Sequence, residues 1–152
     1  ILVYQVRINL SRGKKMKKNL AFLFLMTILL TACAGKGLTP SLGDTTWKLL
    51  SYGAIDSPTP ALPDVDTTIS FNADGNLNGN MGCNRFSGSY EISENKIEIG
   101  PLMSTAMYCE SAMEQETAVL MLLNGTMTFE SDSNTLTLFS EDGSSALKLI
   151  QK

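Results

Sequence analysis

Residues 68–81 read TISFNADGNLNGNM, and this stretch sets the fold that we expect. Ile69 and Phe71 alternate with polar residues, as apolar residues do in a half-buried β-strand. Asp74 and Gly75 together are a strong signal for a hairpin turn. Residues 76–81 can return as a second strand, although its glycines weaken it. The stretch therefore predicts an antiparallel β-hairpin.

Short runs of the same kind continue on both sides of this hairpin, separated by turn residues. Residues 54–66 hold three prolines, which mark a loop. Short sequential strands with tight turns predict an antiparallel meander. The further strands that we expect are residues 46–52, which contain the only tryptophan, Trp47, and residues 87–92, 96–99, 126–130, 135–140 and 146–150. Residues 102–107 are either a further strand or an extended run.

The pattern changes period at residues 112–124, where we expect the one helix. Ser111 and Glu114 fit a capping box, and Asn124 with Gly125 supplies a left-handed C-cap. The second half of this segment is apolar nearly all round, so the helix should be substantially buried. We therefore predict an α+β fold in which a curved antiparallel sheet is packed around one α-helix.

The N-terminal segment has the layout of a secretory signal. Four lysines surround Met16, and an apolar core of about eleven residues follows, which is too short for a membrane-spanning helix of about twenty. The core ends in Leu30, Thr31, Ala32 and Cys33, which resembles the lipobox of bacterial lipoproteins. That resemblance implies that Cys33 receives lipid, with fatty acids such as palmitate, and becomes the new N-terminus. The alternative is an uncleaved anchor with an incidental cysteine.

These features divide the chain into four parts. Residues 1–15 are interpreted as over-extended translation, with a short leader as the alternative, and residues 16–32 as the signal peptide. Residues 33–43 form the lipidated cysteine and a flexible tether, and residues 44–152 form one domain. We expect a bacterial envelope protein. Ala34 lacks the acidic side chain associated with inner-membrane retention, which favours the outer membrane, facing the periplasm, in a Gram-negative cell.

Charge and composition exclude several classes of function. From Cys33 onward the chain carries 6 basic and 15 acidic residues, a net charge of −9. Such a surface repels nucleic acid and anionic headgroups, so the lipid has to hold the protein at the membrane. The chain has no histidine, which excludes histidine triads and histidine metal sites. We expect no metal and no cofactor.

Two strings carry a family resemblance: GNMGCNRFSGSY at residues 79–90 and TAMYCE at residues 105–110. Together they resemble the META domain of HslJ-type envelope lipoproteins, and the early tryptophan fits as well. The resemblance implies a cracked, barrel-like antiparallel meander around a helix. It also implies heat-shock and antibiotic-tolerance phenotypes without an established chemical activity. The motif residues that it assigns a structural role are Gly82, Asn84, Phe86, Gly88, Tyr90, Thr105 and Met107.

The family pattern includes both Cys83 and Cys109, and a disulfide between them is the favoured reading. It would close a loop of about 26 residues, worth roughly 3 kcal/mol. The alternatives are two buried thiols packed as small hydrophobes and a redox pair, although the spacing is not C-x-x-C. A catalytic thiol is disfavoured because no histidine can activate it.

The remaining candidates have a structural and a functional reading. Gly79, Gly82 and Gly88 fit bends better than a phosphate loop. For Arg85, a solvated or salt-bridged surface role, the latter with a helix carboxylate such as Glu114 or Glu116, is preferred over binding of an anionic ligand. A solvated surface is the preferred reading over a calcium site or glycosidase pair for Asp64, Asp66, Asp74, Glu110, Glu114 and Glu116. Core packing is preferred over a soft binding groove for Met103, Met107, Met113, Met121 and Met127.

Taken together, the sequence predicts a non-enzymatic, lipid-anchored envelope protein of the META type. It would support stress or antibiotic tolerance by binding another envelope component, such as a protein. The alternatives are a carrier of a small apolar ligand in a cavity between sheet and helix and, less favoured, an envelope enzyme that uses carboxylates or a thiol.

Overall fold

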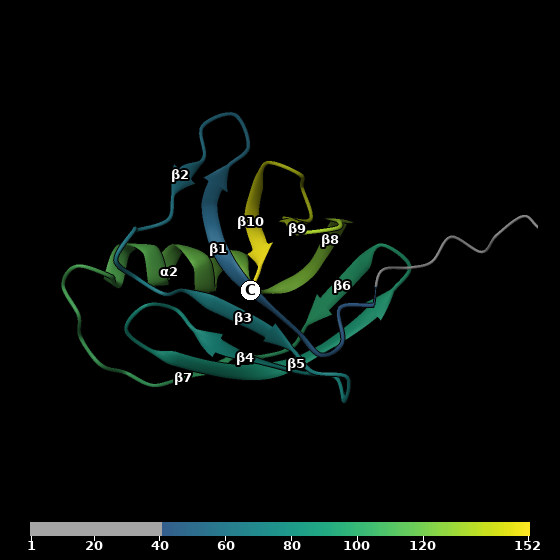
Figure 1. Cartoon of the computed structure of the whole chain (residues 1–152), viewed down its shortest axis with the longest axis horizontal. Helices are drawn as coiled ribbons and strands as arrows, with labels where there is room; N and C mark the ends of the chain where they lie inside the picture. The colour runs from purple at the N-terminus through teal and green to yellow at the C-terminus, as the bar shows by residue number, and fades with distance from the viewer. Residues whose placement is uncertain (1–40) are drawn as a thin grey trace, which may run out of the picture. The chain divides into compact units, whose positions relative to one another are not determined.

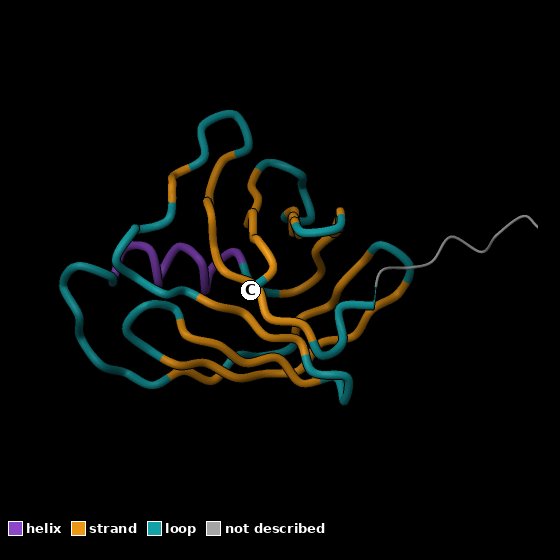
Figure 2. Tube along the Cα trace, in the orientation of Figure 1, coloured by secondary structure: helices purple, strands orange, loops and turns teal. Residues whose placement is uncertain are grey.

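A computed structural model describes residues 41–152 of the chain (Figure 1). The signal peptide, Cys33 and nearly all of the tether that the sequence predicts lie outside these described residues. Figure 2 shows that strands make up most of this part and that one short helix accompanies them. No helix in residues 41–152 is long and apolar enough to span a membrane.

Eight of the strands form one closed antiparallel barrel. They follow one another around it in the order β1 (Thr45–Ala54), β3 (Thr68–Phe71), β4 (Asn76–Asn80), β5 (Arg85–Ser93), β6 (Lys96–Ile99), β8 (Gly125–Asp132), β9 (Thr135–Phe139) and β10 (Ser145–Gln151). β10 pairs with β1, from Trp47 opposite Gln151 to Ala54 opposite Ser145, which closes the barrel. Two very short strands lie off this ring: β2 (Thr59–Pro60) pairs with β1, and β7 (Met103–Ser104) pairs with β5.

The predicted α+β fold, a curved sheet packed around a helix, is therefore wrong. The protein is mostly β, and its barrel is closed without the helix. The physical reason is that inward-facing side chains of the strands fill the barrel themselves, among them Ile69, Phe71 and Leu77, which are fully buried. The helix α2 (Met113–Leu122) packs against β1 and β10 and adds Val119 to this core.

The capping box that the sequence predicts is also absent from the described helix. Ala112 is the N-cap and makes no side-chain capping bond, while Ser111 and Glu114 are exposed. The carbonyl oxygen of Cys109 instead accepts hydrogen bonds from the backbone N–H groups of Ala112 and Met113, at 2.9 and 3.2 Å. The Cys109 carbonyl thus accepts hydrogen bonds from N–H groups at the start of the helix, a role that a capping side chain would otherwise have.

The turn between β9 and β10 is stabilised by Asp142. Its Oδ1 accepts hydrogen bonds from the backbone N–H of Ser144 at 3.0 Å and from the Ser140 hydroxyl at 2.7 Å. The Ser144 hydroxyl donates to the same oxygen, and together these bonds lower the pKa of Asp142 from its usual 3.8 to about 2. The charged form of the carboxylate is therefore favoured by the folded turn.

This shift predicts the acid sensitivity of the turn. Because the folded pKa is lowered, the contribution of Asp142 is complete above its usual pKa of 3.8 and is lost as the pH falls toward about 2. Side-chain carbon shifts followed by NMR should show Asp142 titrating near 2, and Asp142→Asn should remove that titration. A midpoint at the usual value would show that the turn does not bind the carboxylate.

Candidate functional site

The first element of the site is a buried carboxylate on α2. Glu116 is only 4% exposed. Its Oε2 accepts hydrogen bonds from the backbone N–H groups of Asn84 at 2.8 Å and Cys83 at 3.3 Å, and its Oε1 accepts one from the Asn84 side chain at 2.6 Å. Glu116 lies in the first turn of the helix, where the helix dipole favours a negative charge. The carboxylate therefore holds the start of α2 to the turn between β4 and β5.

Asn84 continues this connection to the segment after β7. Its Oδ1 accepts hydrogen bonds from the Thr105 hydroxyl and from the backbone N–H of Met107, each at 2.7 Å. Its Nδ2 donates to the Met107 carbonyl oxygen at 3.0 Å as well as to Glu116. An amide side chain offers two donors and two acceptor sites, and Asn84 uses all four. Both backbone polar groups of Met107 are consequently held by one side chain.

A disulfide joins the same two segments. Cys83 and Cys109 are bonded, with Cα atoms 5.8 Å apart, as the favoured reading of the sequence expects. Cys83 is buried and its neighbour Asn84 is 1% exposed, so the covalent bond and the hydrogen bonds lie next to each other. Residues 105–109 are thereby fixed at both ends, at Thr105 by the hairpin and at Cys109 by the disulfide.

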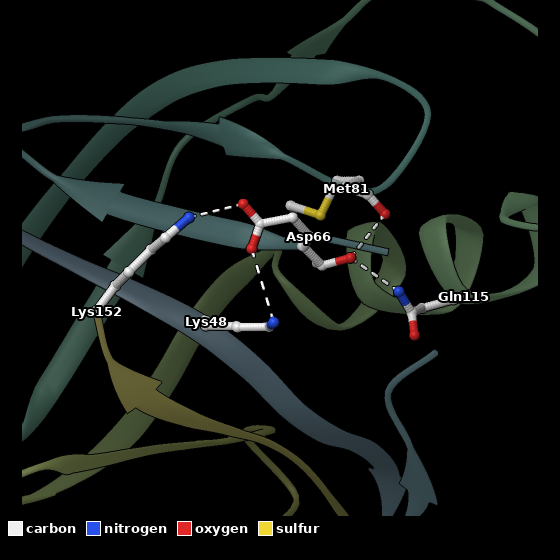
Figure 3. Close-up of polar contacts among 6 residues, drawn as sticks. Lys48, Asp66, Met81, Gln115 and Lys152 are labelled. Atoms are coloured by element: carbon white, nitrogen blue, oxygen red, sulfur yellow. Dashed lines mark hydrogen bonds and ion pairs between the residues drawn. The ribbon is translucent and has the colours of Figure 1, made fainter. Parts of the chain in front are cut away.

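A second buried side chain of α2 holds the loop before β3 (Figure 3). Gln115 donates from Nε2 to the Thr67 hydroxyl at 2.8 Å and accepts the backbone N–H of Leu62 at 2.7 Å. The Thr67 hydroxyl in turn donates to the Met81 carbonyl oxygen at 3.1 Å. Gln115 and Glu116 therefore connect α2 to both sides of the β3–β4 hairpin.

Of the other motif residues, Phe86 and Tyr90 are buried aromatic side chains, and Gly82 and Gly88 lie close to neighbouring side chains. Phe86 and Tyr90 point into the barrel, and Tyr90 packs edge to face against Phe71 with ring centroids 5.1 Å apart. Its hydroxyl donates to the Asn72 carbonyl oxygen at 2.7 Å, and burial raises its pKa above the usual 10.0. Gly82 has φ +119°, and a Cβ there would lie 2.4 Å from Val65 Cγ1. A Cβ at Gly88 would lie 2.6 Å from Leu102 Cδ2, so the Leu102 side chain would have to move to admit a larger residue.

Three large apolar side chains in and next to residues 105–109 are exposed to solvent. Met103 is 73% exposed, Met107 57% and Tyr108 79%. We call residues 103–108 the display loop. Single exposed apolar side chains are common, but these three fall within six residues of one segment whose backbone is fixed. The display loop is the candidate functional site.

Core packing is therefore the wrong prediction for Met103 and Met107, and also for Met121, which is 76% exposed on α2. Met127 is buried as expected, and Met113 is half-buried. The apolar second half of the helix is correspondingly less buried than predicted. The reason is that the closed barrel needs little from α2 beyond Val119 and Leu123, which are fully buried.

The carboxylates follow the solvated-surface prediction with one exception. Asp64, Asp66, Asp74, Glu110 and Glu114 are exposed, whereas Glu116 is buried. Asp66 pairs with Lys152 at 2.6 Å and with Lys48 at 3.9 Å (Figure 3), and its pKa is lowered chiefly by the Lys152 hydrogen bond. No group of metal-binding side chains occurs among the described residues.

Arg85 is solvated, one of the two forms of the preferred surface role, and it does not make the salt bridge to Glu114 or Glu116 that was the other form. Its side chain is exposed, and neither ion pair of the described residues includes it. Glu116, one of the two expected partners, is occupied by Asn84 and Cys83 instead. The spacing of Glu116, Val119 and Leu123 along one helical face is the signal that could have indicated a buried Glu116.

The hollows of the described part open at its surface. The one between α2 and β7, where a sheet–helix cavity was the alternative expectation, measures about 250 Å³ and is lined by Leu102, Ser104, Leu120, Leu123 and Asn124. A larger hollow of about 490 Å³ lies beside Leu42, Ala73 and Tyr90.

The fold and site define a small antiparallel β-barrel domain whose helix is tied to one hairpin by a disulfide and a buried carboxylate. The chain belongs to the META domain family, which matches residues 40–152. No curated protein matches the chain.

Several solved structures have a similar fold. An NMR structure of a protein from Burkholderia xenovorans is 25% identical, with a TM-score of 0.61, over 73% of this chain and 83% of that one. A second NMR structure is 24% identical, with a TM-score of 0.54, over 70% and 87%. A crystal structure of a DUF4847 family protein from Bacteroides vulgatus is 17% identical, with a TM-score of 0.57, over 75% and 96%. The second NMR structure and the crystal structure show only that the fold is similar.

Proposed function

We propose that this protein is a lipid-anchored component of the bacterial envelope that binds another envelope protein and catalyses no reaction. The anchor is Cys33 of the lipobox, which places the barrel at a membrane surface, the outer membrane in a Gram-negative cell. The META family membership is consistent with this, because the resemblance to HslJ-type proteins associates such domains with stress and antibiotic tolerance.

The observation that carries the binding role is the display loop. Asn84 and the Cys83–Cys109 disulfide fix its backbone, while Met103, Met107 and Tyr108 remain in solvent. A preformed surface loses less conformational entropy on association. Methionine and tyrosine are enriched in protein interfaces. The loop thus combines the two properties that a protein-binding segment needs.

The buried polar residues of the motif support a non-enzymatic role. Asn84 uses all of its hydrogen-bonding capacity inside the protein, Glu116 faces three N–H donors, and both described cysteines are bonded to each other. A catalytic group needs access to a substrate, and these groups face one another.

Crosslinking in intact cells, followed by purification of the acylated full chain, tests the proposal. The wild-type protein should recover one partner reproducibly, and Met107→Ser with Tyr108→Ser should reduce its recovery by about tenfold or more. Ile55→Ser, which changes another exposed apolar side chain outside the display loop, is the control. Equal recovery by the loop variant, or no stoichiometric partner at all, would contradict the binding role.

Anchoring is tested separately. Mass spectrometry of the N-terminal peptide should find a lipidated Cys33, and Cys33→Ser should move the protein from the membrane to the soluble fraction. An unmodified Cys33 in membrane-bound protein would contradict the anchor.

A further inference from the structure

Arg85 lies on a part of the barrel surface that differs in charge from the rest. The register places Lys48, Thr68, Asn80 and Arg85 in one row across β1, β3, β4 and β5. A second row runs parallel to it through Thr46, Ser70, Asn78, Ser87 and Met103, and ends on β7. The residues between them in sequence, such as Ile69 and Phe86, are buried, so both rows face outward. We call these two rows the polar face.

The nine positions of the two rows carry hydroxyls, amides, two cations and Met103. None of them is a carboxylate, although Asp66, two residues before Thr68, lies at the Lys48 end with Oδ1 3.9 Å from Lys48 Nζ. The absence of carboxylates from the rows is unexpected in a domain to which all 15 acidic residues of the chain belong. Neighbouring strands show the contrast: on the other half of β5, Glu91 lies opposite Glu98 of β6, and both are exposed. Figure 1 shows β3, β4 and β5 side by side as one surface. Apart from Asp66 at the Lys48 end, the acidic residues therefore lie off these two rows, and the Arg85 end has no carboxylate in an ion pair with it among the described residues.

Arg85 stands between two hollows of this face. One, of about 390 Å³, is lined by polar side chains that include Thr68, Asn78 and Asn80. The other, of about 400 Å³, lies toward β7 and includes Ser87 and Met103. The Arg85 side chain has no ion-pair partner among the described residues. Its guanidinium is thus free to bind a ligand that occupies either hollow.

We propose that the polar face binds a carboxylated glycan, with Arg85 holding a sugar carboxylate. A guanidinium binds a carboxylate through two parallel hydrogen bonds. The Asn78 amide and the Ser87 hydroxyl both donate and accept, which suits sugar hydroxyl groups. From Lys48 to Arg85 the first row crosses three strand spacings, or about 14 Å, which is long enough for an oligosaccharide. This site adjoins the display loop, with which it shares Met103, and its ligand differs from the protein partner proposed for that loop.

The charge pattern favours a glycan over a densely charged polymer. The surrounding carboxylates repel a polyanion such as nucleic acid at long range. A polymer with one carboxylate per sugar and neutral hydroxyls between the charges meets less of this repulsion. The two cations lie at opposite ends of the first row, and the groups between them are uncharged.

Calorimetric titration of the full chain in detergent with a galacturonic acid hexamer tests the proposal. The hexamer should bind in low salt, and Arg85→Gln should weaken binding by about tenfold or more, the effect of losing a charge-assisted hydrogen-bonded pair. Asn78→Ala with Ser87→Ala should weaken it as well. Lys148→Gln removes an exposed cation of β10 that lies outside the polar face, and should leave binding unchanged.

Two further ligands distinguish the contribution of the carboxylates from that of the sugar rings. The fully methyl-esterified hexamer keeps the sugar and loses the charge, and it should not bind measurably. Polyglutamate keeps the carboxylates and loses the sugar, and it should bind more weakly than the hexamer. No binding of the hexamer, equal binding of either substitute, or retained affinity in Arg85→Gln would each overturn the proposal. Circular dichroism and thermal melting should show that the variants are folded, because the Arg85 side chain makes no hydrogen bond within the described protein.

Discussion

Glu116→Ala is expected to lower the free energy of unfolding by about 3 kcal/mol or more. The variant leaves three buried N–H donors of Cys83 and Asn84 without their acceptor. Each such donor costs about 1–3 kcal/mol when it is not compensated. Urea unfolding followed by tryptophan fluorescence measures the change, because the only tryptophan, Trp47, lies in the barrel core.

Two matched variants separate the hydrogen bonds from other effects of the substitution. Glu114→Ala removes an exposed acid from the same helical turn and should change stability by less than about 0.5 kcal/mol. Glu116→Gln keeps one acceptor oxygen but turns an NH₂ group toward N–H donors, so it should cost about 1–3 kcal/mol. If Glu116→Ala unfolded at the same urea concentration as Glu114→Ala, the buried carboxylate would not be holding the helix to the hairpin.

Loss of the Cys83–Cys109 disulfide is expected to have an effect of similar size. The bond spans 26 residues, and a loop of that length contributes roughly 3 kcal/mol by restricting the unfolded chain. Cys83→Ala with Cys109→Ala should lower the melting temperature by about 10 °C. Hydrogen exchange should be faster at the Met107 amide, because residues 105–109 would lose the disulfide and keep only their hydrogen bonds to the hairpin.

Reduction provides the control for this prediction. The wild-type protein treated with dithiothreitol should have the same melting temperature as the double variant. The melting temperature of the double variant itself should not change when dithiothreitol is added. Equal melting temperatures for oxidised and reduced wild-type protein would show that the bond adds nothing to stability.

The Glu116 and disulfide predictions also bear on the proposed function. Both changes loosen the same five residues, 105–109, without touching the exposed Met107 and Tyr108 side chains. If the display loop binds its partner as a preformed surface, these variants should weaken recovery of the partner even under conditions in which the barrel remains folded. The carboxylated glycan should still bind them, because the polar face lies on strands that neither change disrupts.

Several features of the fold were predictable because they depend on neighbouring residues. The hairpin around Asp74 and Gly75 forms between β3 and β4, and Gly75 adopts φ +82° as a tight turn requires. The alternation of Ile69 and Phe71 with polar residues predicts that both side chains are buried, and both are. The pairing of Cys83 with Cys109 followed from the family pattern.

Closure of the barrel was not predictable from these local signals. β1 and β10 lie at opposite ends of the domain sequence. No local pattern of hydrophobic residues indicates that these two strands pair with each other. Once they pair, the barrel interior is filled by strand side chains, and the helix is excluded from the central position that the sequence suggested. Exposure of Met103, Met107 and Met121 is a consequence of that closure.

Most of the strands, the turn at Gly75 and the acidic charge of the domain could be predicted from the residues alone, because each of these depends on residue type and short-range spacing. Only the tertiary structure decided that Glu116 is buried against Asn84, that Arg85 is free on a row without carboxylates, and that the display loop is fixed while its apolar side chains stay in solvent. These features depend on contacts between residues 20 or more positions apart, and such contacts exist only after the barrel has closed.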